Sequence, residues 1–260
     1  MTDRAETAAH YKDSSKLAVR GGFHARFAKN SWFGWVDERL KLSAGSRVLD
    51  VGCGPGWFWA TCKHLPDDLE LNLLDQSTHM VEQATMRLSH LRIGQAVVAD
   101  AAGLPFPDDS FDIVIAMHML YHLPDPAIAL REMNRVLVPG GRCIVTTNSP
   151  LNLPLIAELS RAAFGSAIDD MVQARFGTPV ALDLMKAQFS NVTQQTYNDM
   201  YQVDDPEPVI DMLLTMPPGD QANASGQARL RNAVMDLFAA HDGVVAMPSV
   251  QDMITGICCK

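Results

Sequence analysis

A short glycine-rich segment near residue 50 has the residue types and spacing of a nucleotide-binding loop. It reads Asp50-Val51-Gly52-Cys53-Gly54-Pro55-Gly56 and follows the β-branched apolar run 47–51. Glycines allow a tight turn and let a ligand approach the backbone, because no Cβ stands in the way. An ordinary strand-to-helix turn would satisfy the same spacing, so the loop needs independent support.

Two further carboxylates supply that support. Asp75 ends the predicted strand 70–75, and Asp100 ends the predicted strand 96–100. A carboxylate in the first position can accept hydrogen bonds from both hydroxyls of a ribose, and one in the second can face an adenine amino group. Both lie at the carboxyl ends of strands, where open α/β sheets bind ligands.

The spacing of the glycines narrows the kind of ligand. The loop is GxGxG rather than the GxGxxG of dinucleotide folds, because Trp57 stands where the last glycine would fall. The chain also has no lysine-containing loop of the kind that binds nucleoside triphosphates. We therefore expect a nucleoside-containing cofactor without an essential pyrophosphate, and a NAD-dependent oxidoreductase is a less favoured alternative.

Two histidines follow the predicted strand 111–117 and could act on a substrate. His118 lies at the end of that strand, and His122 lies four positions later. A histidine there can serve as a general base or orient a substrate, and it can equally be a structural side chain. The pair has the spacing of two zinc ligands, but Met119 replaces the glutamate of that motif and no third ligand is evident, so we predict no metal.

Alternating strands and helices must position these residues. The strands predicted with most support are 47–51, 70–75, 96–100, 111–117 and 142–147, with helices over 77–88 and 126–137. This order predicts a parallel sheet covered on both faces, which is a doubly wound, Rossmann-like α/β fold. Segments 192–197 and 254–258 are weaker strand candidates.

Helical segments flank this core. Apolar residues recur at helical spacing over 5–42, and two helices joined near Gly21-Gly22 would fit. Residues 149–189 form a helical excursion where a lid would sit. We therefore divide the chain into an N-terminal helical cap, 1–42, and a main domain, 43–260, with a lid insertion at about 149–189.

Composition limits the partners. The chain has 260 residues and a formal net charge of −9, from 21 Lys and Arg against 30 Asp and Glu. A general nucleic-acid partner is not expected, because phosphate contacts need clustered basic residues. Five cysteines without a CxxC pair indicate reduced thiols. With no signal-peptide pattern and no apolar run of membrane-spanning length, we predict a cytoplasmic protein without a membrane partner.

Several motifs together resemble the class I S-adenosylmethionine-dependent methyltransferases, in the small-molecule group that includes ubiquinone and sterol methyltransferases. They occur in family order over about residues 45–150. The matching segments are Val48–Gly56, Leu74–Ser77, Ala99–Phe106, Asp108–Val114 and Glu132–Gly141. The rest of the chain is less diagnostic.

The resemblance implies a seven-stranded sheet, mostly parallel with an antiparallel last strand, which 254–258 would fit. It implies S-adenosyl-L-methionine as cofactor and S-adenosyl-L-homocysteine as product. Asp50 would reach the ammonium, the glycines would cradle the methionine part, and Asp75 would bind the ribose. The implied cofactor contacts are Tyr11, Arg20, Asp50, Gly52, Cys53, Gly54, Gly56, Asp75, Gln76, Met80, Asp100, Ala101 and His118.

The expected reaction is methyl transfer to an O or N nucleophile of a small molecule, in secondary or specialised metabolism. The protein must mainly align the nucleophile and exclude water, and a base is needed only when the nucleophile carries a proton that must leave. His118 and His122 are the catalytic candidates, and the candidate substrate contacts are Tyr11, His24, Phe27 and Tyr197. We expect a monomer or homodimer. An RNA or protein methyltransferase and a non-catalytic binding module are the remaining alternatives.

Overall fold

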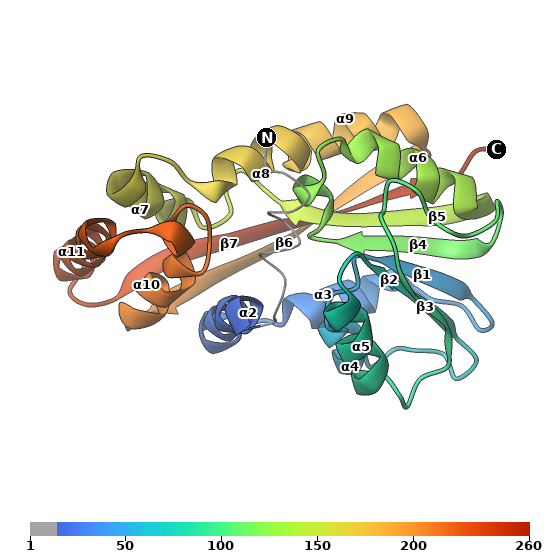
Figure 1. Ribbon diagram of the computed structural model, residues 1–260, viewed down its shortest axis with the longest axis horizontal. Helices are drawn as coiled ribbons and strands as arrows, with labels where there is room; N and C mark the ends of the chain where they lie inside the picture. The colour runs from blue at the N-terminus through green and yellow to red at the C-terminus, as the bar shows by residue number, and fades with distance from the viewer. Residues whose placement is uncertain (1–14) are drawn as a thin grey trace.

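A seven-stranded sheet organises the chain, whose computed structural model describes residues 15–260 (Figure 1). The strand order is β3-β2-β1-β4-β5-β7-β6. Strands β1 to β5 run parallel, and β7 is antiparallel to both of its neighbours. The strands are β1 (Arg47–Val51), β2 (Glu70–Asp75), β3 (Ile93–Val98), β4 (Phe111–Met117), β5 (Leu137–Asn148), β6 (Ser190–Val203) and β7 (Val245–Ile257). The predicted fold class, including the antiparallel last strand, is confirmed.

Helices cover both faces of this sheet, which is why its central strands are apolar on both sides. One face carries α3 (Trp32–Leu40), α4 (Trp57–Thr61) and α5 (Thr78–Arg87) over an apolar cluster that includes Val48 and Leu73. The other carries α6 (Pro126–Val136), α8 (Ile168–Phe176) and α9 (Thr178–Gln188) over a cluster that includes Leu49 and Val145. The short η1 (Leu120–His122) follows β4.

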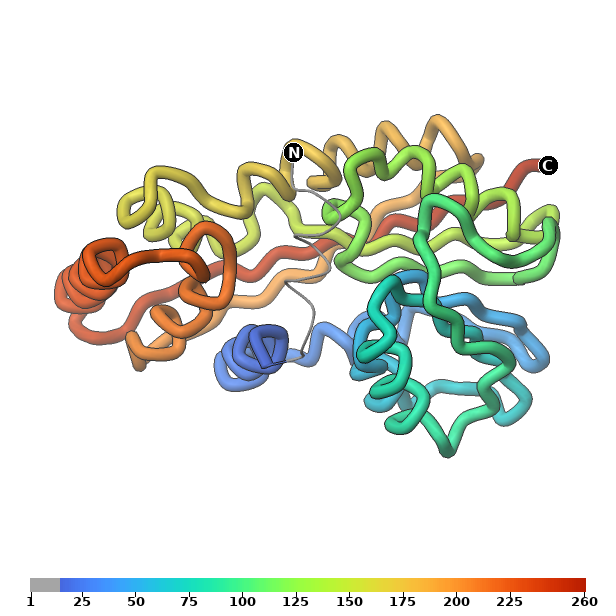
Figure 2. Tube along the Cα trace, in the orientation of Figure 1, coloured from blue at the N-terminus to red at the C-terminus, as the bar shows by residue number. Residues whose placement is uncertain are grey.

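Strands β6 and β7 continue beyond the rest of the sheet as a two-stranded ribbon. Strand β5 pairs with residues 251–257 of β7, whereas β6 pairs with β7 as far as Val245. The projecting ribbon supports α2 (Ser15–Phe27), α7 (Pro154–Phe164), α10 (Glu207–Leu214) and α11 (Ala224–Ala240), with η2 (Gly219–Gln221) between the last two. We call these helices and the ribbon the helical lobe. It has an apolar core of its own and lies at one end of the molecule (Figure 2).

The first described helix differs from its prediction. Helix α2 runs unbroken through Gly21-Gly22, so the predicted break at these glycines is wrong. A Cβ at Gly21 would stand 3.5 Å from the ring of Trp57, an ordinary van der Waals distance, so α2 passes close to the residue that follows the glycine-rich loop. The chain turns instead after Phe27, where the Asp199 carboxylate accepts the backbone N–H groups of residues 29 and 30.

The segment 149–189 divides between the two parts of the molecule. Helix α7 packs against α11 in the helical lobe, whereas α9 packs on α6 and on β5 to β7 of the sheet. The strand candidates 192–197 and 254–258 are the inner parts of much longer strands. Most outward side chains of β6 are polar, as suits an edge strand, and the apolar pattern that reveals a strand is therefore weak.

Candidate active site

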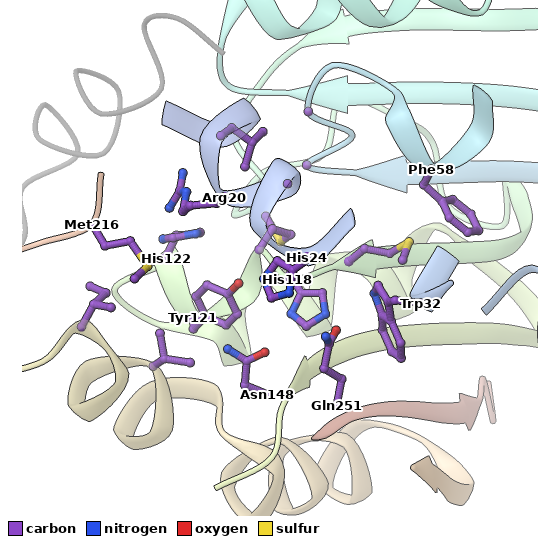
Figure 3. A pocket seen from close by; sticks show the side chains of 18 of the residues that line it. Arg20, His24, Trp32, Phe58, His118, Tyr121, His122, Asn148, Met216 and Gln251 are labelled. Carbon is purple, nitrogen blue, oxygen red and sulfur yellow. The ribbon is translucent and has the colours of Figure 1, made fainter. Parts of the chain in front are cut away.

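A cavity of about 920 Å³ opens at the carboxyl ends of β1, β2 and β4 and extends under the helical lobe (Figure 3). Its volume lies in the upper part of the range for small-molecule sites. The glycine-rich loop forms one side, and α2, α7 and α10 contribute the other. The cavity therefore joins the predicted cofactor residues to the part of the chain that the sequence motifs do not reach.

Gly52 and Gly54 shape the loop that follows β1. Both have positive φ angles, +74° and +52°. A Cβ on Gly52 would lie 2.8 Å from Cγ of Met119, whereas one on Gly54 would meet nothing within 4 Å. The first glycine thus permits close packing within the protein, and the second leaves open space in the cavity for a ligand.

Gly56 has a structural role different from those of Gly52 and Gly54, and it does not line the cavity. It precedes α4 with a φ of +75°, and a Cβ there would lie 3.0 Å from Leu88 and 3.1 Å from the backbone of Ala84. The third glycine of the loop therefore lets α4 pack against α5. Cys53, between the first two glycines, does line the cavity.

Asp50 lies at the floor of the cavity with a carboxylate that the protein leaves half paired. Its side chain is 3% exposed, and Oδ2 accepts a hydrogen bond of 2.7 Å from Trp59 Nε1. Its Oδ1 is buried with no hydrogen-bond partner among residues 15–260. Burial raises the pKa of Asp50 to about 7. An unpaired buried carboxylate is costly, and a bound cation would relieve that cost.

Asp75 and Asp100 are held in place by backbone N–H groups. Asp75 Oδ1 accepts from Ser77 N at 2.9 Å, and Oδ2 accepts from Gly54 N at 3.0 Å. Burial still raises the pKa of Asp75 above its ordinary value. Asp100 Oδ1 accepts from Ala102 N at 2.8 Å. Asp75 keeps lone pairs for a ligand, and Asp100 lines the cavity with the other adenosine-side residues predicted from the sequence, namely Gln76, Met80 and Ala101.

His118 stands at the centre of the cavity wall, directly after β4. Its backbone has a φ of +49°, and its N–H donates to Thr146. The imidazole hydrogen-bonds Gln251 of β7, and its Nε2 is buried without a partner in the described structure. Trp32 meets the ring edge-on at 5.6 Å. Burial lowers the pKa of His118 to about 4, so the ring is neutral near pH 7.

His24 reaches the same cavity from α2, so the helical lobe places a second imidazole near His118 (Figure 3). His24 Nδ1 lies 2.9 Å from the hydroxyl oxygen of Tyr201, on β6. Burial and the charge of Arg20 lower the pKa of His24 to about 4. Arg20 itself lines the cavity, with Nε donating to the backbone oxygen of Lys16.

The remaining predicted residues are placed differently from one another. His122 ends η1 and lines the cavity. Phe27 does not line it, because its ring packs beside Phe23 in the core of the helical lobe. Tyr197 is also outside it: this buried residue donates to the backbone oxygen of Asn30 at 2.7 Å and contacts Asp199. Tyr11 lies outside the described residues.

Several cavity residues had no signal in the sequence motifs. Asn148 ends β5, and Gln251 lies in the buried middle of β7. A polar residue within an apolar strand is a weak indication of a site, but 251 lies outside the segment that was predicted as a strand. Trp59, the partner of Asp50, is buried in the core, and its indole N–H serves the site.

Comparison with known proteins shows the family. Residues 49–145 match the family described as "Methyltransferase domain". The demethylmenaquinone methyltransferase of Staphylococcus aureus (strain JH9) is 32% identical over 168 residues, 64% of this chain and 67% of the relative. The chain belongs to the class I S-adenosylmethionine-dependent methyltransferases. The enzyme of the same name from Staphylococcus haemolyticus is 35% identical over 134 residues, 51% of this chain. That match spans 56%, just over half, of the relative's length.

Solved structures agree on the fold of this methyltransferase. The cyclase SpnF superposes with a TM-score of 0.58 at 22% identity, over 98% of this chain and 97% of its own. At that identity the likeness concerns the fold alone. No helix within residues 15–260 is long and apolar enough to cross a membrane, and no cluster of potential metal ligands is found among the same residues.

S-adenosylmethionine is the family's methyl donor, and the cavity suits it. The orphaned Oδ1 of Asp50 fits an ammonium group, and Asp75 retains acceptor sites for ribose hydroxyls. The space beside Gly54 admits a ligand against the backbone, and the cationic Arg20 suits a carboxylate. These residues would hold the cofactor without any pyrophosphate contact, as the glycine spacing predicts.

Proposed function

We propose that this methyltransferase acts on an oxygen or nitrogen atom of a small molecule that binds between β4 and the helical lobe. The observation that carries the proposal is His118, whose Nε2 is buried without a partner in the cavity wall. Met119 follows it and packs against Gly52 of the cofactor loop, so the histidine stands where the cofactor side and the lobe side of the cavity meet.

When bound, S-adenosylmethionine would supply a methyl group on a positively charged sulfur, and the electron pair of the broken methyl–sulfur bond would stay with the product S-adenosylhomocysteine. His118 is neutral near pH 7, so its Nε2 can accept the proton of an acceptor hydroxyl or of a protonated amine. Transfer of the hydroxyl proton to Nε2 would leave the electron pair of the O–H bond on the acceptor oxygen, which is the nucleophile that methyl transfer needs. Gln251 stabilises the imidazolium by hydrogen-bonding the ring, and Trp32 excludes water from its edge.

The enclosed cavity favours a small acceptor over a macromolecule. Its acceptor side is built from apolar residues of α2, α7 and α10. An RNA methyltransferase would need a basic face, and the net charge of the chain is −9. The curated relatives are named for demethylmenaquinone, a quinone rather than a macromolecule, which supports the same class. We infer that the helical lobe covers the part of the cavity that binds the methyl acceptor. A cytoplasmic location and a monomeric or dimeric state stay predictions.

Because a cyclase has the same fold, the fold alone does not identify the reaction, and analysis of the product is the decisive measurement. Titration calorimetry should show binding of S-adenosylmethionine and S-adenosylhomocysteine, and a metabolite screen with labelled methyl donor should yield a labelled small molecule. Absence of binding at millimolar concentration would refute methyl transfer. A labelled RNA or protein with no labelled small molecule would refute the acceptor class.

The role of His118 has its own test. His118→Asn keeps a residue type that tolerates the left-handed backbone but removes the basic nitrogen. Turnover should fall by about a hundredfold or more, as when a general base is lost, while the affinity for S-adenosylhomocysteine stays within about twofold. His90→Asn, at an exposed histidine, is the matched control. Unchanged turnover in His118→Asn with unchanged acceptor affinity would remove His118 from the mechanism.

A further inference from the structure

Two neutral histidines from different parts of the fold face one cavity. His118 follows β4 of the sheet, and His24 comes from α2 of the helical lobe. Among residues 15–260, the ring of His118 is hydrogen-bonded to Gln251 and the ring of His24 to Tyr201. An imidazole has two ring nitrogens, so each histidine keeps one nitrogen for a ligand.

The contact between His24 and Tyr201 uses one ring nitrogen, Nδ1, which lies 2.9 Å from the hydroxyl oxygen. Either group can be the donor in this pair, depending on the tautomer of the imidazole. The other ring nitrogen, Nε2, carries a lone pair in one tautomer and a hydrogen in the other.

His24 lines the cavity, and its contact with Tyr201 leaves Nε2 as the nitrogen that can serve a ligand there. At His118 the unpartnered Nε2 is an acceptor when Nδ1 donates to Gln251, and a buried acceptor without a donor is costly. A hydroxyl group both donates and accepts, so hydroxyl groups of a ligand suit both nitrogens in either tautomer of His24.

The surroundings of the two rings are largely apolar. Beyond His24 the wall is formed by side chains of α7, α10 and the segment after α10, namely Ile156, Ala157, Met212, Leu213 and Met216. Charged side chains also line the cavity, among them Arg20 on α2 beside His24 and Asp169 on α8, and neither belongs to this apolar group. This part of the cavity suits a ligand body without charge.

Resting on the proposed function, we propose that the methyl acceptor is an uncharged, mainly apolar molecule with two hydroxyl groups, one bound by His118 and the other by His24. The hydroxyl at His118 is the one that is methylated. His24 is a positioning and specificity residue, because it holds the second hydroxyl and never receives the transferred group.

Naphthalene derivatives can test this pairing, because they share one apolar body and differ in their donors. The probes are the isomeric naphthalenediols, β-naphthol and naphthalene, added to protein saturated with S-adenosylhomocysteine. Binding is followed by tryptophan fluorescence, since Trp32 contacts His118 in the cavity wall. At least one diol should bind the wild-type protein roughly tenfold more tightly than β-naphthol, the difference expected for one further hydrogen bond.

Variants of His24 separate a specific contact from general damage. In His24→Leu the preference for the diol over β-naphthol should fall to about one, while the affinity for β-naphthol itself stays within about threefold. Tyr201→Phe keeps His24 but removes the hydroxyl that holds its ring in place, so it should lose part of the preference. His90→Leu, at an exposed histidine, should behave as wild type. Thermal unfolding of each variant checks that it folds.

The outcomes separate this inference from the proposed function. The proposal of a methyl acceptor with two hydroxyl groups is overturned if the wild-type protein binds S-adenosylhomocysteine but shows no preference for any diol. It is also overturned if that protein binds none of the probes. A His24→Leu variant that folds and keeps the preference overturns it as well. Failure of the wild-type protein to bind S-adenosylhomocysteine in calorimetry refutes methyl transfer instead.

Discussion

The half-paired carboxylate of Asp50 makes the stability of this methyltransferase depend on pH in an unusual direction. Burial raises the pKa of Asp50 from 3.8 to about 7 in the folded protein. As the pH falls through 7, the folded protein takes up a proton that the unfolded chain takes up only near pH 4. The free energy of unfolding contributed by this group therefore rises as the pH falls, over the window from about 7 to about 4.

The magnitude follows from the two pKa values. One pKa unit corresponds to about 1.4 kcal/mol, so keeping the carboxylate ionised above pH 7 costs the folded protein on the order of 4 kcal/mol. Asp50→Asn removes the titration and keeps an oxygen for the Trp59 N–H bond. Between about pH 5.5 and about pH 7, the wild-type protein should lose about 2 kcal/mol more than the variant.

Urea unfolding of both proteins at the two pH values measures this difference directly. Asp211→Asn, at an exposed carboxylate of α10, should keep the wild-type profile. An ammonium group bound beside Asp50 would stabilise the ionised carboxylate and so lower its pKa. Binding of S-adenosylhomocysteine near pH 7 should therefore release protons from the wild-type protein and not from Asp50→Asn. Parallel pH profiles for the wild type and Asp50→Asn would refute the reasoning, as would equal proton release.

Three further substitutions test other parts of the structure. Gly52→Ala should weaken S-adenosylhomocysteine binding at least tenfold in calorimetry, because the new Cβ would lie 2.8 Å from Met119 at a φ of +74°; Gly103→Ala, with nothing within 4 Å, should bind as wild type. Tyr197→Phe should lower the free energy of unfolding by about 1 kcal/mol and leave turnover unchanged, and a large loss of turnover would contradict its place outside the cavity. Asp252→Ala should cost about 2 to 4 kcal/mol in urea unfolding, because three side-chain donors lose a buried partner, and a cost below 1 kcal/mol would contradict this account.

The cofactor side of the site could be predicted because its chemistry is local in sequence. Asp50, Gly52 and Gly54 fall in one turn after one strand, and Asp75 ends the next strand along the chain. Parallel topology then brings the ends of these strands together at one edge of the sheet. A pattern read from neighbouring residues was therefore sufficient to place Asp50 and Asp75 in one cavity.

The acceptor side could not be predicted in the same way. His24 and Tyr201 are hydrogen-bonded across 177 positions, and this contact exists only because α2 lies on the projecting part of β6. The aromatic residues show the same limit. Phe27 and Trp32 are aromatic residues five positions apart in the sequence. Phe27 packs in the core of the lobe, whereas Trp32 lines the cavity. Apolar periodicity identifies a buried face but not which buried residues border a cavity.

The separate core of the helical lobe has a consequence for how this enzyme can change. The residues that would hold the cofactor follow β1 and β2. The side chains of these strands belong to the apolar clusters that fill the two faces of the sheet. The wall opposite them is built by a different cluster, and the two halves are joined by the β6–β7 ribbon, the turn into α3 and the connections of α7 to β5 and α8 (Figure 2). Substitutions within the lobe can reshape the acceptor chamber while the sheet stays intact. The architecture thus separates what must stay fixed, the use of one methyl donor, from what can diverge, the molecule that receives the methyl group.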